Sequence, residues 1–398
     1  MIDVDISHIW NGISLPELLE TEREIFAAHE RLAEALADVP ALELERIAAA
    51  AEAIRSAAPI CVVIAAADQL SGIQAAMELL PHPEKGTQLL FAGFTLSTRQ
   101  WNYLTAQLEG KDFTLLVISQ TGTILESAIA FRDLRWLMER RFGTEAMEKR
   151  IFAVTREDSP LWQMARQQRW ECFATRSGLY ENVLGPGGLL PLAVAGMDIA
   201  RILQGAERAK ADYDLRSFEN PLWLYAGVRN ALCRKGCRLE VLGGFYPGFR
   251  QLGIWWQQLF SGMEGRCGKG PFPIPAEYPQ DLYGPGWRLL SGEQGVFETL
   301  LCFSGEDAAH TVGSDVNDLE GLNRLAGKTL EEVRRQLYQS TVSDHDDAGV
   351  PVMTMDLGQL DPEKLGEIFA FFTLACGISA HMLGVDTAPC HEEAIGAN

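Results

Sequence analysis

The chain lacks the basic residues and the long apolar runs that mark several classes of protein. Its 398 residues hold 34 Lys and Arg against 54 Asp and Glu, a formal net charge of −20. A nucleic acid or an anionic membrane surface needs a basic face, so neither is expected as a partner. No apolar run reaches membrane-spanning length, and the N-terminus lacks the layout of a signal peptide. We therefore expect a cytoplasmic protein.

The sequence also lacks the cysteine spacing of a metal site. Its eight cysteines are scattered, and several lie in apolar runs. Cys233 and Cys237 are four residues apart, but they have neither a second pair nor nearby histidines. We expect free thiols in a reducing compartment, with no metal and no cofactor.

What the sequence does contain is an alternation of short apolar runs with helical segments. The runs at 61–64 and 115–118 have the pattern of strands buried on both faces. Further strands are predicted at 89–92, 151–155, 239–242, 300–303 and 352–355. Strands that alternate with helices predict an α/β protein with parallel, doubly wound sheets.

The length of the chain predicts more than one domain. Residues 1–44 are predicted to form an N-terminal helical segment, 45–205 a first domain, 206–385 a second domain of similar plan, and 386–398 a short polar tail. The Gly- and Pro-rich stretch 259–292 predicts long structured loops. Such loops on an α/β scaffold are a frequent place for chemistry.

The most informative stretch is the turn that follows the predicted strand 115–118. It contains Ser119, Gln120, Thr121 and Thr123 and leads into an amphipathic helix. Backbone N–H groups and the positive end of the helix dipole would point at a ligand there, and the hydroxyl groups would add donors. The pattern predicts an anion site. A simple turn, in which Ser and Thr cap the helix, explains the same residues equally well.

Several stretches, taken in order, resemble bacterial glucose-6-phosphate isomerases. Residues 119–126 resemble the phosphate loop of that family, and 188–196 resemble the helix after its first signature. Residues 255–270 are similar to its active-site loop, and 323–328 and 345–351 resemble two later segments. The resemblance extends over almost the whole chain. It implies two sugar-isomerase (SIS) domains, each a five-stranded parallel sheet in an αβα sandwich, with extra N-terminal helices, in a homodimer.

The resemblance further implies a sugar phosphate, or a related carbohydrate derivative, as the ligand. On the positions that match the family, the ligand-binding residues are Ser119, Gln120, Thr121, Thr123 and Gln69.

The two ligand loops depart from the family pattern. The family's first loop is rich in glycine, whereas Ala65 to Gln69 carry side chains here, including the carboxylate of Asp68. In the second loop Gln120 stands in place of a lysine and Ile124 in place of a threonine. Positive charge is lost while hydroxyl donors remain, so we expect the loop to hold a neutral sugar or a weakly bound anion.

The catalytic positions depart further. Interconverting an aldose phosphate and a ketose phosphate requires a base near the sugar, a cation that stabilises the enediolate and an acid–base group that opens the ring. By resemblance, Gly262 stands at the position of the glutamate base, Tyr180 at the arginine and Tyr283 at the histidine. The C-terminal lysine signature of the family is missing. Glu264 and His345 remain as candidate catalytic residues.

Each candidate also has a plain structural interpretation. We favour the interpretation of Glu264 as a solvated loop carboxylate, and of His345 as a histidine that orders a loop or a dimer contact. Tyr180 and Tyr283 would either fill the former pocket or offer a stacking surface.

Three hypotheses follow. In the first, the chain binds a sugar phosphate or related carbohydrate, and its isomerase activity, of the glycolysis and gluconeogenesis class, is weak or lost. In the second, it is an active sugar isomerase that uses substitute residues such as Glu264. In the third, it is a non-catalytic structural or regulatory dimer partner.

Overall fold

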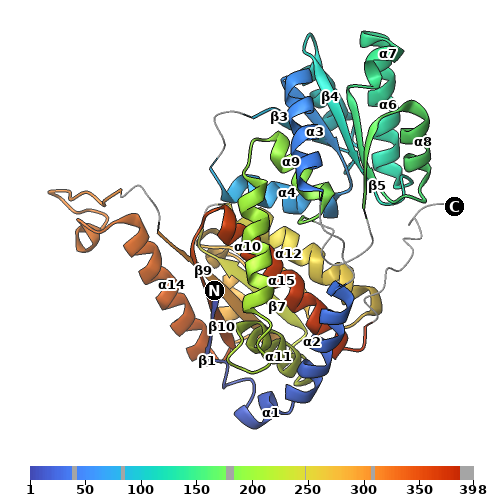
Figure 1. Ribbon diagram of the computed structural model, residues 1–398. Coiled ribbons are helices and arrows are strands. Elements are labelled where there is room, and N and C mark those ends of the chain that lie inside the picture. Colours follow the sequence, from blue (N-terminus) through green and yellow to red (C-terminus); the bar gives the residue numbers. More distant parts are fainter. Residues whose placement is uncertain (38–42, 82–85, 176–182, 247, 306–309, 386–398) are drawn as a thin grey trace. The chain divides into compact units, whose positions relative to one another are not determined.

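Two five-stranded sheets organise the chain, each within its own unit (Figure 1). The computed structural model describes residues 1–37, 43–81, 86–175, 183–246, 248–305 and 310–385. The first unit comprises Glu34–Arg208 and Leu365–Thr373, and the second comprises Met1–Ala33, Ala209–Lys364 and Leu374–Val385. The predicted α/β class with two five-stranded sheets is confirmed.

The sheet of the first unit is wholly parallel. Its strands are β2 (Ile60–Ile64), β3 (Gln88–Ala92), β4 (Phe113–Ile118), β5 (Ile151–Thr155) and β6 (Glu171–Ala174), in the order β3-β2-β4-β5-β6. Strands β2, β4 and β5 are buried at every residue, because helices cover both faces of a parallel sheet.

The helices of the first unit cover the two faces of this sheet (Figure 1). Helices α5 (Thr98–Leu108), α6 (Leu125–Phe142) and α8 (Pro160–Gln168) bury one face in a continuous apolar core. The other face carries α3 (Leu44–Ala57), α4 (Ala67–Leu79) and α9 (Pro186–Val194), which contact one another. The short α7 (Thr144–Met147) and the longer α10 (Ile199–Asp212) complete the helices up to residue 212.

The sheet of the second unit is mixed. Its strands are β1 (Asp3–His8), β7 (Leu239–Gly244), β8 (Phe272–Glu277), β9 (Val296–Ser304) and β10 (Val352–Gln359), in the order β1-β10-β9-β7-β8. Four of the strands are parallel, but β1 pairs antiparallel with β10, and Val4 lies opposite Met355.

Strand β1 corrects the prediction that residues 1–44 are entirely helical. Residues 3–6 alternate polar and apolar side chains, and Val4 is buried while Asp3 and Asp5 are exposed. This period of two suits an edge strand with one buried face. Helices α1 (Leu15–Leu19) and α2 (Glu22–Ala37) follow it.

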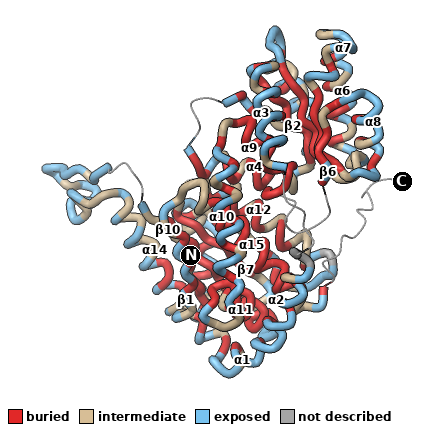
Figure 2. The backbone as a smooth tube through the Cα atoms, viewed as in Figure 1, coloured by how far each residue is buried: buried red, intermediate tan, exposed pale blue. Residues whose placement is uncertain are grey.

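Helices also cover both faces of the second sheet. Helices α13 (Gly286–Leu290) and α14 (Leu330–Asp347) border an apolar core on one face. Helices α11 (Pro221–Arg234), α12 (Phe249–Met263) and the C-terminal part of α15 (Pro362–Met382) bring side chains together on the other. Among the described helices, α15 alone is long and apolar enough to span a membrane, but 89% of its most apolar window is buried inside the protein (Figure 2).

The predicted loop region 259–292 contains more regular structure than expected. It includes the end of α12, strand β8, helix α13 and two short 3₁₀ helices, η2 (Gly265–Cys267) and η3 (Gln280–Tyr283).

The parallel strands of the two sheets share one order. In each sheet, the first parallel strand lies between the second and the third, so the connections leave in opposite directions from the first and third of them. Such a switch point, at the carboxyl ends of β2 and β4 or of β7 and β9, is where open α/β sheets bind ligands.

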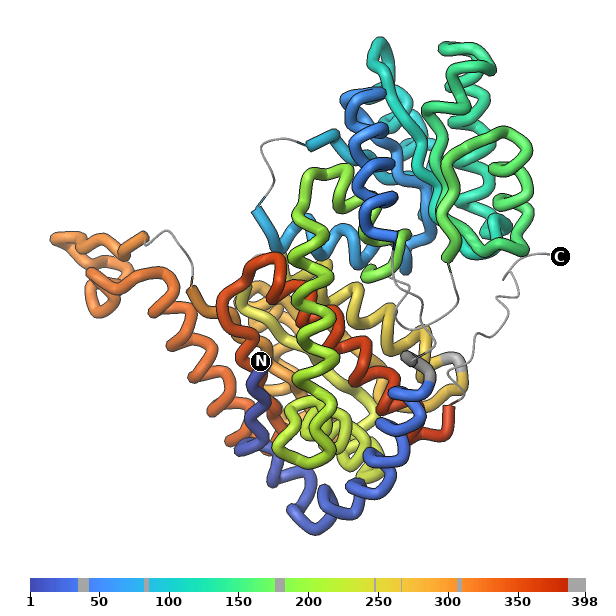
Figure 3. The backbone as a smooth tube through the Cα atoms, viewed as in Figure 1, coloured from blue at the N-terminus to red at the C-terminus, as the bar shows by residue number. Residues whose placement is uncertain are grey.

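The units differ in the segment that follows the third strand. In the first unit this is the short turn from Ser119 to Ile124, whereas in the second the chain runs from Ser304 to α14 at Leu330. Residues 310–329, which we call the arm, include the 3₁₀ helix η4 (Asn323–Leu325) and extend from the start of α14 (Figure 3). Val312 and Lys328 tie its two sides together, since the Val312 N–H donates to the Lys328 carbonyl at 2.9 Å.

Candidate functional site

The turn after β4 is closed by its own side chains. Ser119 is buried, and its Oγ accepts a hydrogen bond from the Gly122 N–H at 3.0 Å. Gly122 has a φ of +73°, and a Cβ there would lie 2.9 Å from the Cβ of Leu161 on α8. The turn therefore requires glycine at this position.

The threonine hydroxyls of this turn bond to each other and leave the start of α6 uncapped by a side chain. Thr123 Oγ1 donates to Thr121 Oγ1 at 2.9 Å. The N-cap residue of α6 is Ile124, whose side chain makes no cap hydrogen bond. The hydroxyls thus lie beside a helix N-terminus whose first N–H groups receive no hydrogen bond from the side chain of the N-cap residue. Of the two interpretations of the turn, the helix-capping one does not describe this geometry.

The loop after β2 meets the same edge of the sheet. Asp68 and Gln69 are half-buried in the first turn of α4. A Cβ at Gly187, in the first turn of α9, would lie 3.1 Å from Ile118 Cγ2 and 3.9 Å from Gln69 Oε1. The starts of α4 and α9 and the end of β4 therefore converge at the switch point. Gln120 faces this edge with its carbonyl oxygen already bonded to the Arg156 N–H at 3.3 Å.

Gly262, which the family resemblance aligns with a glutamate base, lies in the last turn of α12 and is half-buried. Among the described residues, a Cβ built there would meet no side chain, and no backbone beyond its own stretch of helix, within 4 Å. By contrast, a Cβ at Gly253 in the same helix would lie 2.6 Å from the Pro275 Cβ. The space beside Gly262 is therefore open, and a side chain at this position would meet no steric obstacle.

Glu264 lies two residues further on and is not a solvated loop carboxylate. It is 1% exposed, and Nη1 of Arg229 donates to both of its oxygens, at 2.6 and 2.7 Å. Arg229 is fully buried and also donates from Nε to Glu240 Oε2 at 2.5 Å. Burial by itself lowers the pKa of the Arg229 guanidinium, but the carboxylates of Glu264 and Glu240 outweigh it and hold that pKa well above its ordinary value.

His345 is also buried, on the opposite face of the second sheet. It lies in the last turn of α14, and its Nδ1 is 2.5 Å from Glu298 Oε2. The other oxygen of Glu298 accepts a hydrogen bond from the Tyr278 hydroxyl. The histidine is therefore part of a buried network in a helix rather than a loop residue.

The two tyrosines at family catalytic positions are in different situations. Tyr283 ends η3 and is 77% exposed. Tyr180 lies outside the described residues, as does the tail 386–398.

No metal centre is found in the part of the chain that the structure describes. No group of three or more His, Cys, Asp or Glu side chains in it could hold an ion. The described cysteines, Cys233 and Cys237 among them, are free thiols.

Comparison with known proteins identifies the family. Proteins named glucose-6-phosphate isomerase from Bacillus thuringiensis (strain Al Hakam) and Bacillus cereus (strain AH187) are each 37% identical to this chain over 357 residues, covering 86% of it and 79% of the relative. The chain belongs to the glucose-6-phosphate isomerase family. The predicted resemblance is thereby confirmed, although no protein-family model matches the chain.

Solved structures agree with this family at the level of fold. A crystal structure of a hypothetical protein from Thermus thermophilus has a TM-score of 0.85 at 19% identity, covering 97% of this chain and 95% of that one. A glucose-6-phosphate isomerase from Chlamydia trachomatis has a TM-score of 0.70 at 16% identity, covering 86% of this chain and 69% of that one.

Sequence reasoning missed the buried charged residues of the second unit. Arg229, Glu240, Glu298 and Tyr278 form the two networks around Glu264 and His345. A signal was present: Glu240 and Glu298 are the only charged residues of β7 and β9, which are otherwise mostly apolar. A carboxylate within a buried strand needs a partner, and that partner is not identifiable from local sequence.

Proposed function

We propose that this member of the glucose-6-phosphate isomerase family binds a sugar phosphate or related carbohydrate at the turn Ser119–Thr123, and that its isomerase activity is weak or lost. The observation that carries the proposal is the open space beside Gly262, where the family resemblance implies a glutamate base. General acid–base catalysis is worth roughly 10²–10⁴ in rate. Without a carboxylate at this position, proton transfer between the two sugar carbons has no base.

The environment of Glu264 supports the same proposal. A general base must reach the substrate proton directly or through one water. Glu264 is 1% exposed, and both of its carboxylate oxygens accept hydrogen bonds from Arg229. Freeing its carboxylate would break both of its hydrogen bonds with the buried Arg229 guanidinium, which costs stability. We therefore favour a structural role for Glu264 over the substitute-base hypothesis.

Binding is supported by the geometry of the turn after β4. The N-terminus of α6 has no side-chain cap, the starts of α4 and α9 lie at the same sheet edge, and the hydroxyls of Thr121 and Thr123 are beside them. Helix N-termini and hydroxyl donors bind phosphate oxygens without a cation. The carboxylate of Asp68 weakens the site for a dianion and favours a ligand held mainly through neutral hydroxyl groups.

We also propose a cytoplasmic homodimer, in which the arm contacts a second copy of the chain. Its backbone is ordered by internal hydrogen bonds, including Asn323 Nδ2 to the Asp315 carbonyl at 2.7 Å. Yet Val316 is 101% exposed and Leu319 88%. An ordered segment that presents apolar side chains to solvent is typical of a surface that is buried in an assembly.

A coupled assay that converts fructose 6-phosphate to glucose 6-phosphate tests the loss of activity. We expect a turnover below about 1 s⁻¹, the lower end of the ordinary enzyme range. Gly262→Glu should raise turnover above that of Gly262→Gln, which fills the same space without a carboxylate. A wild-type turnover well above that limit, abolished by Glu264→Gln in a folded protein, would establish the substitute-base hypothesis instead.

Ligand binding is tested separately by thermal unfolding. Millimolar fructose 6-phosphate should raise the melting temperature, because a ligand that binds the folded state stabilises it. The rise should become smaller in a Thr121→Val, Thr123→Val double variant. No rise with any sugar or sugar phosphate would favour the non-catalytic dimer partner.

A further inference from the structure

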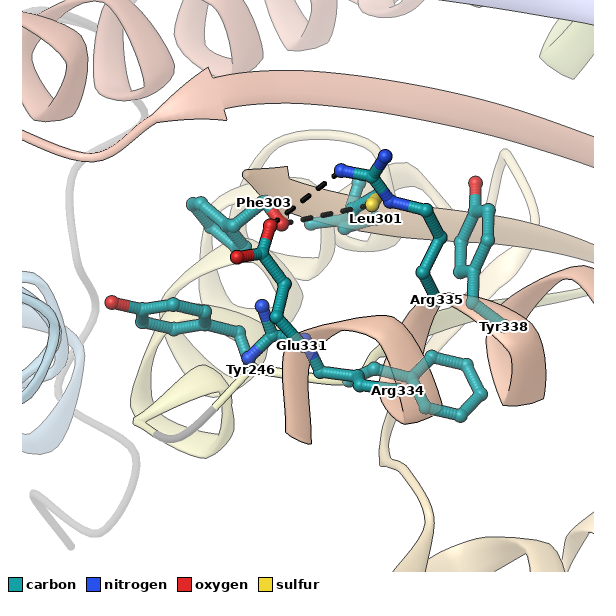
Figure 4. A pocket seen from close by; sticks show the side chains of 9 residues that line it. Tyr246, Leu301, Phe303, Glu331, Arg334, Arg335 and Tyr338 are labelled. Atoms are coloured by element: carbon teal, nitrogen blue, oxygen red, sulfur yellow. Dashed lines mark hydrogen bonds and ion pairs between the residues drawn. The ribbon is translucent and has the colours of Figure 1, made fainter. Parts of the chain in front are cut away.

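The switch point of the second sheet contains a narrow crevice that none of the predicted site residues line. Phe245 and Tyr246 follow β7, Cys302 and Phe303 end β9, and α14 supplies Glu331, Arg334, Arg335 and Tyr338 (Figure 4). By topology it corresponds to the place that the Ser119 turn occupies in the first unit. It lies wholly within the second unit.

The walls of the crevice are aromatic and fixed by contacts. The rings of Tyr246 and Phe303 are 4.7 Å apart, and the rings of Phe245 and Tyr338 are 5.8 Å apart. The Arg334 guanidinium lies 5.7 Å from the centroid of the Tyr246 ring. Two adjacent arginines thus line one crevice of a chain whose net charge is −20.

Arg335 is the arginine at the open side. Its side chain is 57% exposed, and its Nη2 lies 3.5 Å from Glu331 Oε1, too far for a good hydrogen bond. In Figure 4 the guanidinium points toward that carboxylate. The Glu331 carboxylate therefore lies where an anion bound to Arg335 would lie. At this distance it does not form the paired hydrogen bonds that a guanidinium can donate.

The size of the crevice limits what can enter it. Its enclosed part has a volume of about 10 Å³, which is room for a single water-sized atom. A sugar ring does not fit, but one oxygen of a compact oxyanion does, with the other oxygens at the exposed Arg335. Burial and the Asp356 carboxylate raise the pKa of the Cys302 thiol, so the thiol stays protonated and adds no negative charge to the crevice; it donates to the Phe303 carbonyl at 3.7 Å.

We propose that this crevice is a second anion site, in which Arg334 and Arg335 bind phosphate or the phosphoryl group of a phosphate monoester. The bound oxyanion replaces the Glu331 carboxylate at Arg335. Two guanidinium groups match the charge of a phosphate dianion, and their planar donors suit its oxygens. The site is independent of the Ser119 turn and of any isomerase activity.

The test is a calorimetric titration with inorganic phosphate at constant ionic strength, with chloride as the balancing anion. Arg335→Gln should weaken phosphate binding roughly tenfold or more, because it removes charged hydrogen bonds. Glu331→Gln should strengthen it, because it removes the competing carboxylate. Arg288→Gln is the matched control: this arginine is 75% exposed on α13 and pairs with Glu293 instead, so binding should not change.

The opposite signs of the two substitutions separate a binding site from a folding defect, since misfolding would weaken binding in both. A Ser119→Ala variant separates the two switch points and should keep phosphate binding at the second. The proposal is overturned if the wild type binds no phosphate at millimolar concentration, if Arg335→Gln and Arg288→Gln have equal effects, or if Ser119→Ala removes all binding.

Discussion

Arg229 holds Glu264 by both oxygens of its carboxylate, with Nη1 at 2.6 and 2.7 Å, inside the second unit. The contact joins α11 to the end of α12, two residues beyond Gly262. Buried charge thus holds the end of α12 in place, at the position where the family resemblance implies a glutamate base. If the proposed loss of activity holds, this part of the fold has outlasted its chemistry.

The Arg229 cluster contains two carboxylates for one guanidinium, so substitutions of its members should reduce the free energy of unfolding by different amounts. Arg229→Met leaves Glu264 and Glu240 buried without a cation and should cost at least about 3–5 kcal/mol in the free energy of unfolding. Glu264→Gln leaves a balanced Arg229–Glu240 pair and should cost only about 1–3 kcal/mol. Urea unfolding measures both, with the exposed Glu320→Gln as a control. Equal losses would contradict this account of the cluster.

Two glycines of α12 should respond in opposite ways to alanine. Gly262→Ala should stabilise the protein by up to about 1 kcal/mol, because a helical glycine costs chain entropy and the space beside it is open. Gly253→Ala should destabilise it by about 1–3 kcal/mol, because its Cβ would lie 2.6 Å from the Pro275 Cβ. Thermal unfolding distinguishes them. A loss of stability in Gly262→Ala would show that the space is not open.

The Ser119 hydroxyl should matter for the shape of the turn after β4. Ser119→Ala leaves the Gly122 N–H without its acceptor and should cost about 1–3 kcal/mol. It should also reduce the thermal shift produced by fructose 6-phosphate. Ser97→Ala is a suitable comparison, because Ser97 caps α5 through a longer contact of 3.4 Å on the exposed surface. A Ser119→Ala protein as stable as the wild type would contradict the role of this bond.

His29 should make the protein less stable in mild acid. Burial, with a smaller contribution from Arg216, lowers the pKa of its imidazole below the ordinary 6.5, and Trp223 Nε1 donates to its Nδ1 at 2.8 Å. A group whose folded-state pKa is lowered contributes stability above its unfolded pKa, and that stability is lost as the pH falls. His29→Gln should therefore lose less stability than the wild type between about pH 7 and about pH 5.5. Identical pH slopes in denaturant titrations would contradict it.

The arm should control the oligomeric state. Val316→Asp and Leu319→Asp together should convert a dimer to a monomer in light scattering, because a buried carboxylate is costly at an interface. The fold of each subunit should persist, since both side chains are exposed within their own chain. Glu320→Gln in the same arm should leave the dimer intact. A wild-type monomer at micromolar concentration would refute the proposed role of the arm.

Apolar runs identified the buried strands from sequence, because a strand covered on both faces has little choice of residues. Strand β8 escaped notice because Pro273 and Pro275 are typical of a loop. They are tolerated since β8 is an edge strand and needs hydrogen bonds on one side only. Strand β1 escaped because its pairing partner, β10, lies near the other end of the chain.

The sequence alone predicted only part of the candidate site. The position of Ser119 follows from local order along the chain, since it comes directly after a predicted strand. Gly262 was expected in a loop, whereas it lies in the last turn of α12. The environments of Glu264 and His345 do not follow from local order, because each is determined by a partner far away in sequence: Arg229 and Glu298. Pairings of this kind depend on tertiary packing. The only sign of them in the sequence is an isolated charged residue within an apolar run.

Glu240 and Glu298 lie on neighbouring strands, and their side chains enter opposite layers of the second unit. A slip of β9 by one residue would reverse which layer each of its side chains enters. Glu298 would then join the two carboxylates around Arg229, and Thr299 would lose Glu240, to which it now donates at 3.1 Å. The observed alignment gives each buried carboxylate a donor and the one-residue slip does not, so these charges disfavour that mispairing of the strands.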